Sequence, residues 1–280
     1  MFQPIHSWAS IRVSGADRFE FLQGQLTQDL DKIRDGQPML AGWANAKGRL
    51  LCIAWVLDWN DAVHLILPAN LIDSVARRLG MYVLRSQVEI SQPDTAVWFL
   101  TNKDSEESAP IPCFESNFCI FQLNNSSRLM LGFGELPDTI AGTDNAHTDT
   151  EWRAACITAG LPWVYQATNE IFVPQMLNLD LLNAISFSKG CYVGQEIVAR
   201  TQNLGRIKRR MFAFETNGTN IQAGAAVSAG DDNAGTVVDA VADGEHTQLL
   251  AVIRLEKLKA ELNVNGAILR ATELPYPVPQ

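Results

Sequence analysis

The sequence lacks the closely spaced cysteines and histidines from which proteins build metal sites. It has five cysteines and four histidines in 280 residues, no C-x-x-C pair, and no histidine at ligand spacing from a cysteine. Zinc and iron–sulfur sites need such thiolate and imidazole ligands. The sequence therefore predicts that this chain by itself holds no metal. An odd number of scattered cysteines also favours reduced thiols over a disulfide framework.

Long apolar segments and an excess of positive charge are missing as well. The longest apolar run, Leu50–Leu57, is far shorter than the roughly 20 residues that span a bilayer. Met1–Gly15 has no apolar stretch of the signal-peptide kind. Lysine plus arginine number 22 against 31 acidic residues, a net charge of −9, which disfavours non-specific binding to nucleic acid or membrane surfaces. These properties predict a soluble, cytoplasmic protein.

What the chain does have is enough apolar sequence for about two domains. Its 280 residues are 47% hydrophobic and 19% charged, which is typical of globular proteins with roughly 150 residues per domain. Helical and strand-like patterns are mixed in the first part of the chain. After Arg210, short strand-like segments are separated by Gly, Asn and Asp. The predicted class is α+β followed by a small antiparallel barrel or sandwich, since closing a sheet hides its edges.

Individual elements follow from periodicity and from start and stop signals. Apolar residues at three- and four-residue steps over 19–33 predict one helix, which Asp35-Gly36 ends. Asn45–Gly48 predicts a hairpin turn between two strands. Thr148–Glu151 is a capping box, which predicts a helix that begins there and ends at Gly160.

The segment Lys189–Glu196 (K-G-C-Y-V-G-Q-E) is the most unusual one in the chain. Cys191 lies between two glycines, and the apolar spacing just downstream predicts that a helix begins there. The positive end of the helix macrodipole and the ammonium of Lys189 would both favour the thiolate, so Cys191 is expected to be the most reactive cysteine. The alternative is a tight glycine turn around a small buried cysteine. Cys52 and Cys156 fall on apolar faces and are expected to be unreactive.

Cations are concentrated in one stretch downstream of this segment, with no acidic residue among them. They are Arg200, Arg206, Lys208, Arg209 and Arg210. Such a cluster suits a phosphate, the anionic tail of a ligand or an acidic partner. The alternative is a solvated linker.

Several of these segments resemble a known family. Phe21–Asp29 (F-L-Q-G-Q-L-T-Q-D), Lys189–Glu196 and the run from Gly190 to Arg210 closely resemble the YgfZ folate-binding proteins. These belong to the superfamily of the glycine-cleavage T-protein, an aminomethyltransferase, and the resemblance extends to Leu274–Tyr276. The motif residues that it singles out are Lys189, Gly190, Cys191, Tyr192, Gly194, Gln195 and Glu196.

The resemblance implies a T-protein-like fold, a ring of two related α+β subdomains with a C-terminal antiparallel β-barrel around a central channel. The folate-binding α+β region would cover residues 1–205. Within it, subdomain A would take about 1–40 and 110–205, and subdomain B about 41–109. The barrel would cover 206–280.

The ligand that the resemblance implies is tetrahydrofolate or another reduced folate. The residues that it places in contact with the ligand are Trp8, Trp152, Thr158 and Gln25. Aromatic faces suit the rings of folate and cations suit its glutamate tail, although tryptophans more often pack in cores. Relatives commonly have a glutamate where Thr158 stands, so the pterin would meet a hydroxyl without charge. T-proteins carry an acidic residue after the hairpin glycine, whereas here Gly48 is followed by Arg49–Cys52, so aminomethyl transfer would lack its charge partner.

The function expected from the resemblance is that of a folate-binding accessory protein without transferase activity. It would act in iron–sulfur cluster protein assembly and maintenance and in tRNA modification, with Cys191 as its functional thiol. Its expected partners are folate and iron–sulfur enzymes or assembly proteins. Two alternatives stay open: a one-carbon transferase of the aminomethyltransferase type, and a protein that binds tRNA directly through the cations of residues 200–210.

Overall fold

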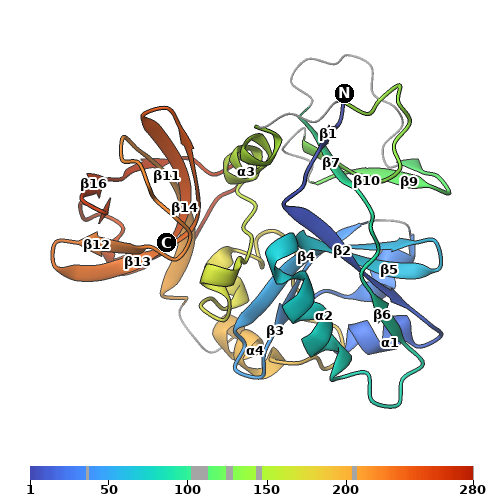
Figure 1. The fold of residues 1–280 in the computed structure, drawn as a ribbon. Coiled ribbons are helices and arrows are strands. Elements are labelled where there is room, and N and C mark those ends of the chain that lie inside the picture. The colour runs from blue at the N-terminus through green and yellow to red at the C-terminus, as the bar shows by residue number, and fades with distance from the viewer. Residues whose placement is uncertain (36–37, 102–112, 124–128, 143–146, 204–206, 280) are drawn as a thin grey trace.

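Three β-sheets form the framework of the protein. The structure is a computed structural model that describes residues 1–35, 38–101, 113–123, 129–142, 147–203 and 207–279. In Figure 1 the C-terminal strands form one end of the molecule, the two N-terminal sheets form the other, and α3 lies between them. Within the described ranges, no helix is long and apolar enough to cross a membrane.

The first part of the chain builds two five-stranded antiparallel sheets. In order across the first sheet, the strands are β3 (Met39–Ala44), β4 (Leu50–Trp59), β5 (Ala62–Pro68), β2 (Trp8–Ser14) and β6 (Glu89–Ser91). In the second they are β1 (Gln3–Pro4), β7 (Val97–Thr101), β10 (Leu129–Gly134), β9 (Phe118–Gln122) and β8 (Cys113–Phe114). β2 therefore joins strands that lie far downstream in the sequence. The subdomain boundaries near residues 40 and 110 stay predictions.

The predicted hairpin between β3 and β4 is confirmed. The side-chain oxygen of Asn45 accepts hydrogen bonds from the backbone amides of Lys47 (2.8 Å) and Arg49 (3.0 Å), which is the usual way in which asparagine stabilises a turn. Gly48 completes the turn with φ +68°, a conformation that favours glycine. The following residues, Leu50–Leu57, are all buried, as their unbroken apolar run predicts.

Short helices connect the strands. They are α1 (Arg18–Gln23), α2 (Ile72–Gly80), α3 (Thr148–Thr158) and α4 (Gln195–Asn203), together with the 3-10 helices η1 (Leu30–Asp35), η2 (Ala69–Leu71), η3 (Gln166–Thr168), η4 (Pro174–Leu177) and η5 (Leu255–Lys257). The helix predicted just after Gly194 is confirmed as α4.

The prediction of one continuous helix over 19–33 was wrong. α1 ends at Gln23, and the chain then turns to pair with β3 before η1 begins. The amide of Thr27 donates to the carbonyl of Gly42 (2.8 Å), and the amide of Gly42 donates to the Thr27 hydroxyl (2.8 Å). The apolar periodicity is real, but this long-range pairing takes the backbone of the middle residues away from the helix.

α3 begins and ends where its signals predict, although its first turn is held differently. The Thr148 hydroxyl is buried and does not cap the helix. Asp149 instead accepts hydrogen bonds from the amide (2.9 Å) and hydroxyl (2.5 Å) of Ser7, which ties α3 to the start of β2. At the other end Gly160 has φ +65° and Leu161 donates back to the carbonyl of Cys156 (2.9 Å), a glycine-dependent helix end.

The C-terminal strands form a seven-stranded antiparallel sheet. In order they are β16 (Ala267–Ile268), β15 (Asn263–Val264), β12 (Ala226–Ala229), β13 (Asp232–Asp243), β14 (His246–Arg254), β11 (Arg209–Thr216) and β17 (Arg270–Thr272). Its two edge strands, β16 and β17, are separated in the chain by Leu269 alone, so the sheet curls into a nearly closed barrel. The predicted class, α+β with a C-terminal antiparallel barrel, is confirmed.

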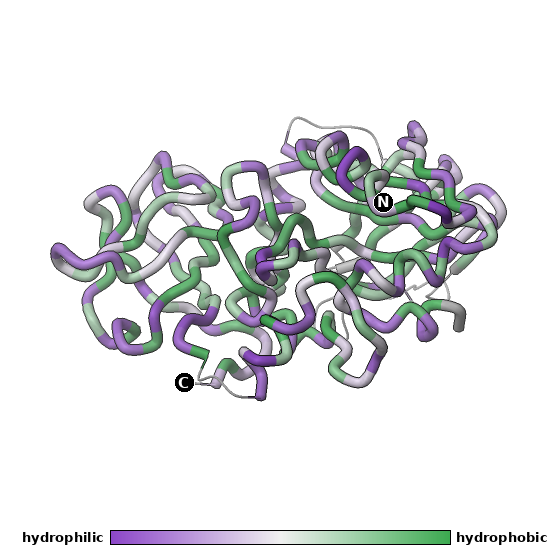
Figure 2. Tube along the Cα trace, turned by 90° about the horizontal axis from the view of Figure 1, so that it is seen from below, coloured by the Kyte–Doolittle hydropathy of each residue, from purple (hydrophilic) through white to green (hydrophobic). Residues whose placement is uncertain are grey.

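Alternating residues of the barrel strands serve two cores. On β14, Leu249, Ala251 and Ile253 point into the barrel, whereas Leu250 and Val252 belong to the main core of the N-terminal sheets. Successive side chains of a strand point to opposite faces, so one strand can pack on both sides. In Figure 2 hydrophobic stretches of the chain run through the interior of the molecule, and many hydrophilic stretches lie at the outer turns.

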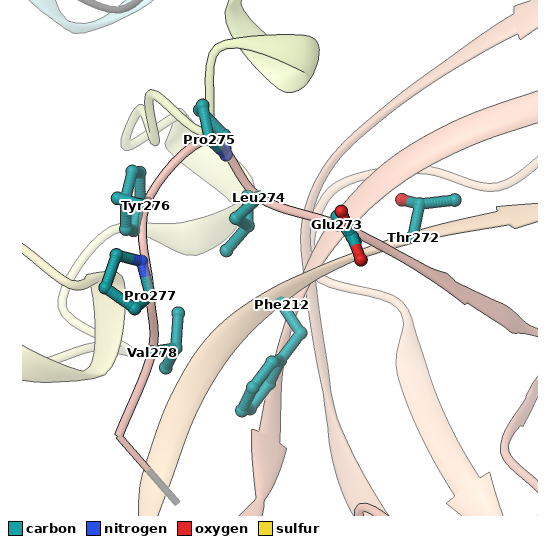
Figure 3. A pocket seen from close by; sticks show the side chains of 8 residues that line it. All are labelled: Phe212, Thr272, Glu273, Leu274, Pro275, Tyr276, Pro277 and Val278. Atoms are coloured by element: carbon teal, nitrogen blue, oxygen red, sulfur yellow. The ribbon is translucent and has the colours of Figure 1, made fainter.

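The C-terminal segment connects the barrel to the main core. The Tyr276 hydroxyl donates to the carbonyl of Gly160 (2.7 Å), and burial raises the pKa of Tyr276 to about 12, so the phenol stays a donor. A side chain at Gly160 would meet the Tyr276 ring at 2.7 Å. Between this segment and Phe212 of β11 lies an open groove of about 470 Å³ (Figure 3).

Candidate functional site

The segment that contains the motif lies along the end of α1. The amide of Ser186 donates to the carbonyl of Thr27 (2.9 Å), and the amide of Val193 donates to the carbonyl of Gly24 (3.2 Å). The two parts of the chain that carry the most distinctive sequence, 21–29 and 189–196, are therefore in direct contact. We call residues 186–194 the thiol loop, because Cys191 lies near its middle.

Two glycines let the thiol loop approach the hairpin turn between β3 and β4. A side chain at Gly194 (φ +82°) would lie 2.5 Å from the carbonyl oxygen of Asn45. A side chain at Gly48 would lie 2.8 Å from Cβ of Ile197, in the first turn of α4. Distances below 3.0 Å do not occur for real Cβ atoms. The glycine before Gln195 in the motif is therefore required by this packing.

Lys189 points into the protein rather than towards the thiol. Its ammonium nitrogen donates to the carbonyls of Gln23 (2.7 Å), Leu26 (3.0 Å) and Gln28 (2.7 Å). It also lies 5.3 Å from the centre of the Tyr192 ring. Burial lowers the pKa of Lys189 to about 8, which leaves the group largely protonated at pH 7. The charge that the sequence assigns to thiol activation is thus directed at backbone carbonyls.

Cys191 is exposed, unlike the other cysteines whose side chains the structure describes, Cys52, Cys119 and Cys156. Burial raises the pKa of Cys52 to about 12 and raises that of Cys156 further, so both stay thiols at neutral pH. Cys191 lies four residues before α4 begins, beyond the first turn over which a helix dipole acts strongly. Its exposure is therefore the property that sets it apart.

The two tryptophans expected to contact folate lie in one buried cluster. The rings of Trp8 and Trp152 meet edge to face with centroids 5.1 Å apart, and Trp163 packs on Trp8 at 4.5 Å. Trp8 is 4% exposed, and Trp152 and Trp163 are fully buried. The fold brings Trp8 and Trp152 together, but their rings touch, and no planar group fits between them in this arrangement.

The other two residues expected at the ligand lie in different surroundings. Gln25 is buried in the turn after α1, and its side-chain oxygen accepts no hydrogen bond from the described residues. Thr158 is the last residue of α3 and is exposed. Of the two, Gln25 belongs to the turn that holds the thiol loop.

The cations between 200 and 210 do not share one environment. Arg210 is buried and makes two hydrogen bonds to the Asp180 carboxylate, at 2.6 and 2.8 Å. Arg200 is exposed and lies 3.7 Å from Glu196 on the same helix. Lys208 is exposed and Arg209 is half-buried, and Arg206 lies outside the described residues. Within the described ranges, no group of His, Cys, Asp and Glu side chains is arranged to hold a metal ion.

Sequence reasoning missed a charged cluster that joins α3 to the barrel. Asp239 is 2% exposed; it accepts a hydrogen bond from Arg153 and another from the Tyr165 hydroxyl (2.7 Å). Arg153 also donates to the carbonyl of Ala240 (2.9 Å). The signal was an aspartate inside the apolar strand sequence V-V-D-A-V of β13, because a charge at a buried strand position needs a partner.

Known proteins resemble this chain both in sequence and in fold. No family model matches the chain. The tRNA-modifying protein YgfZ of Yersinia pseudotuberculosis serotype O:1b (strain IP 31758) is 29% identical over 239 residues, which cover 78% of the chain and 72% of that protein. The protein of the same name from Colwellia psychrerythraea (strain 34H / ATCC BAA-681) is 29% identical over 231 residues, covering 76% and 70%. The resemblance to the YgfZ proteins is confirmed.

A solved structure places the YgfZ-like chain in the T-protein fold. The glycine cleavage system aminomethyltransferase T from Bartonella henselae matches it with a TM-score of 0.75 over 98% of the chain and 85% of that protein. The sequence identity is 13%, so this likeness shows a shared fold. The segment Lys189–Glu196 thus lies on a T-protein fold, at the contact between α1, the hairpin turn and α4.

Proposed function

We propose that the protein is a folate-binding accessory protein that acts in iron–sulfur protein assembly or maintenance and in tRNA modification, without transferase activity of its own. The relatives that carry the name tRNA-modifying protein YgfZ support the tRNA part. The observation that carries the proposal is the exposed thiol of Cys191 on a loop that is fixed on both sides. An accessible thiol on a rigid loop suits chemistry with a partner molecule.

The hairpin turn argues against aminomethyl transfer. Arg49, which follows the turn glycine, donates to the backbone carbonyl of Ile171. Leu50, Leu51 and Cys52 are buried in β4. None of these side chains can supply the negative charge that a positively charged transfer centre needs.

The folate part rests on the family resemblance and on a partial fit of the indole cluster. The indole nitrogen of Trp152 is a buried donor without an acceptor among the described residues, and the pterin ring offers nitrogen and oxygen acceptors. A buried donor without a partner costs roughly 1–3 kcal/mol, so a ligand acceptor there would be favourable. Because the rings of Trp8 and Trp152 touch, a ligand that uses their faces must first separate them.

Titration with tetrahydrofolate should therefore quench tryptophan fluorescence in a saturable way. We expect Trp8→Phe and Trp152→Phe each to raise the Kd about tenfold, which corresponds to roughly 1.4 kcal/mol of lost contact. Trp98→Phe is the matched control, since Trp98 packs in a separate small core beside Phe2. Equal affinity in all three variants would remove folate from the proposal.

The cellular part is tested with a strain that lacks the endogenous gene. Expression of the unaltered protein should restore iron–sulfur enzyme activity and thiolated tRNA, whereas Cys191→Ser should restore less than a tenth of either. Ser188→Ala, another exposed change in the thiol loop, should rescue fully. Full rescue by Cys191→Ser would show that the thiol is not needed, provided that both variants accumulate to the same level.

A further inference from the structure

The turn after α1 forms a socket of backbone carbonyls. The last carbonyls of a helix have no partner within it, and residues 24–28 turn away before another helix begins. Three of these carbonyl oxygens, from Gln23, Leu26 and Gln28, converge on one point, which the ammonium of Lys189 occupies. An ammonium has three N–H donors, so this geometry uses all of them.

The socket lies beside the stretch that carries the thiol. Lys189 precedes Cys191 by two residues, and Val193, which donates to the carbonyl of Gly24, follows it by two. The exposed cysteine is thus held between two attachments to the same turn. Tyr192 is buried, and its ring lies over the ammonium, which keeps the backbone beside the thiol against the protein.

The charge of Lys189 is not directed at the sulfur. Besides the three carbonyls, the charged groups that act on the ammonium are the carboxylates of Asp29 and Asp31. Because its three donors are used by these carbonyls, the ammonium has none left for the sulfur of Cys191. The conventional role of a lysine near a reactive cysteine, stabilisation of the thiolate, does not describe this geometry.

We propose that Lys189 is a positioning residue for Cys191: its ammonium fills the carbonyl socket at the end of α1 and so fixes the thiol loop in one conformation. The inference builds on the proposed function in that it takes Cys191 to be the working thiol. In this role Lys189 holds the backbone that carries Cys191 and does not take part in the chemistry of the thiol.

The test is the mobility of a nitroxide spin label on Cys191. Lys189→Met keeps the length of the side chain and removes its charge and donors. We expect the electron paramagnetic resonance spectrum to change from mainly slow to mainly fast motion, and amide hydrogen exchange over 187–193 to accelerate at least tenfold. Lys259→Met, at an exposed lysine of the barrel domain, is the matched control. All proteins carry Cys113→Ser, so that Cys191 is the exposed thiol among the four that remain.

Label mobility and exchange rates equal to those of Lys259→Met would overturn the proposal. A second measurement uses the unaltered protein and does not depend on how the variant folds. With 15N at the lysine side chains, an ammonium enclosed by three carbonyls should exchange slowly with water and give one protected NH3⁺ signal at neutral pH. Its absence would equally overturn the proposal. Neither experiment requires folate or a cellular partner, so the positioning role can fail or hold separately from the proposed function.

Discussion

Replacing Asp180 by alanine is expected to lower the free energy of unfolding by about 3–5 kcal/mol, the usual loss when one partner of a buried ion pair is removed. Asp180 makes two hydrogen bonds to Arg210, and the two side chains are 7% and 5% exposed. Arg210 also donates to the carbonyl of Gln175 (3.0 Å). Without Asp180 the guanidinium would remain buried beside η4 and β11 with no counter-charge. Urea unfolding at pH 7 measures the loss.

The matched control is Asp232→Ala. Asp232 pairs with Lys257 at 2.5 Å, but its side chain is 68% exposed. Water screens such a pair, so its removal should change stability far less than the removal of Asp180 does. A loss at Asp180 as small as the loss at Asp232 would show that the buried guanidinium finds another partner or reaches solvent.

The same ion pair bears on tRNA binding. Arg210 is committed to Asp180, and Arg200 lies near Glu196. Arg210 therefore has an acidic partner from a distant part of the chain, and Arg200 has an acidic neighbour one turn before it on the same helix. Direct binding of tRNA through this stretch would rest on Arg206, Lys208 and Arg209, in a chain whose net charge is −9.

Stability should fall by about 2–3 kcal/mol between pH 7 and pH 4.5 because of one histidine. His64 is 3% exposed and packs against Trp59 and Phe133. Burial and the nearby Arg12 lower the pKa of His64 from 6.5 to about 4. Below pH 6.5 the unfolded chain therefore binds a proton that the folded protein resists until about pH 4. Stability is full above pH 6.5 and is lost progressively below it.

The measurement compares the pH dependence of urea unfolding in three proteins. His64→Phe replaces the titrating imidazole by another aromatic ring. In this variant the free energy of unfolding should fall by about 2–3 kcal/mol less between pH 7 and pH 4.5 than in the unaltered protein. His246→Gln, at an exposed histidine, should leave the pH dependence unchanged. Carboxylates that titrate in the same range contribute equally to all three proteins. Parallel curves for the unaltered protein and His64→Phe would contradict the assignment.

Local sequence signals predicted most elements correctly. The hairpin at Asn45–Gly48, the helix end at Gly160 and the helix after Gly194 all follow from residues a few positions apart. The helix predicted over 19–33 failed at its middle, because Thr27 bonds with Gly42 of β3. A periodic pattern identifies the residues that face the core, but it does not show whether their backbone groups form hydrogen bonds within a helix or with a distant strand.

At the candidate site, too, the sequence predicted which residues matter but not how distant residues contact one another. The sequence singled out the thiol loop, the turn after α1, Trp8 and Trp152 as candidate site residues. In the structure the thiol loop contacts the turn after α1, and Trp8 packs on Trp152. The sequence could not show that the two indole rings touch. Nor could it show that Lys189 faces carbonyls rather than the thiol, because both facts depend on where distant segments pack.

The order of the amino acids by itself determined the hairpin turn at Asn45–Gly48, the end of α3 at Gly160 and the start of α4, since each depends on side chains and backbone a few residues apart. Tertiary structure alone decided which charged side chains bond to distant parts of the protein. Burial and hydrogen bonding depend on neighbours far away in the chain. The surroundings of Lys189 and Arg210 were therefore fixed only by folding.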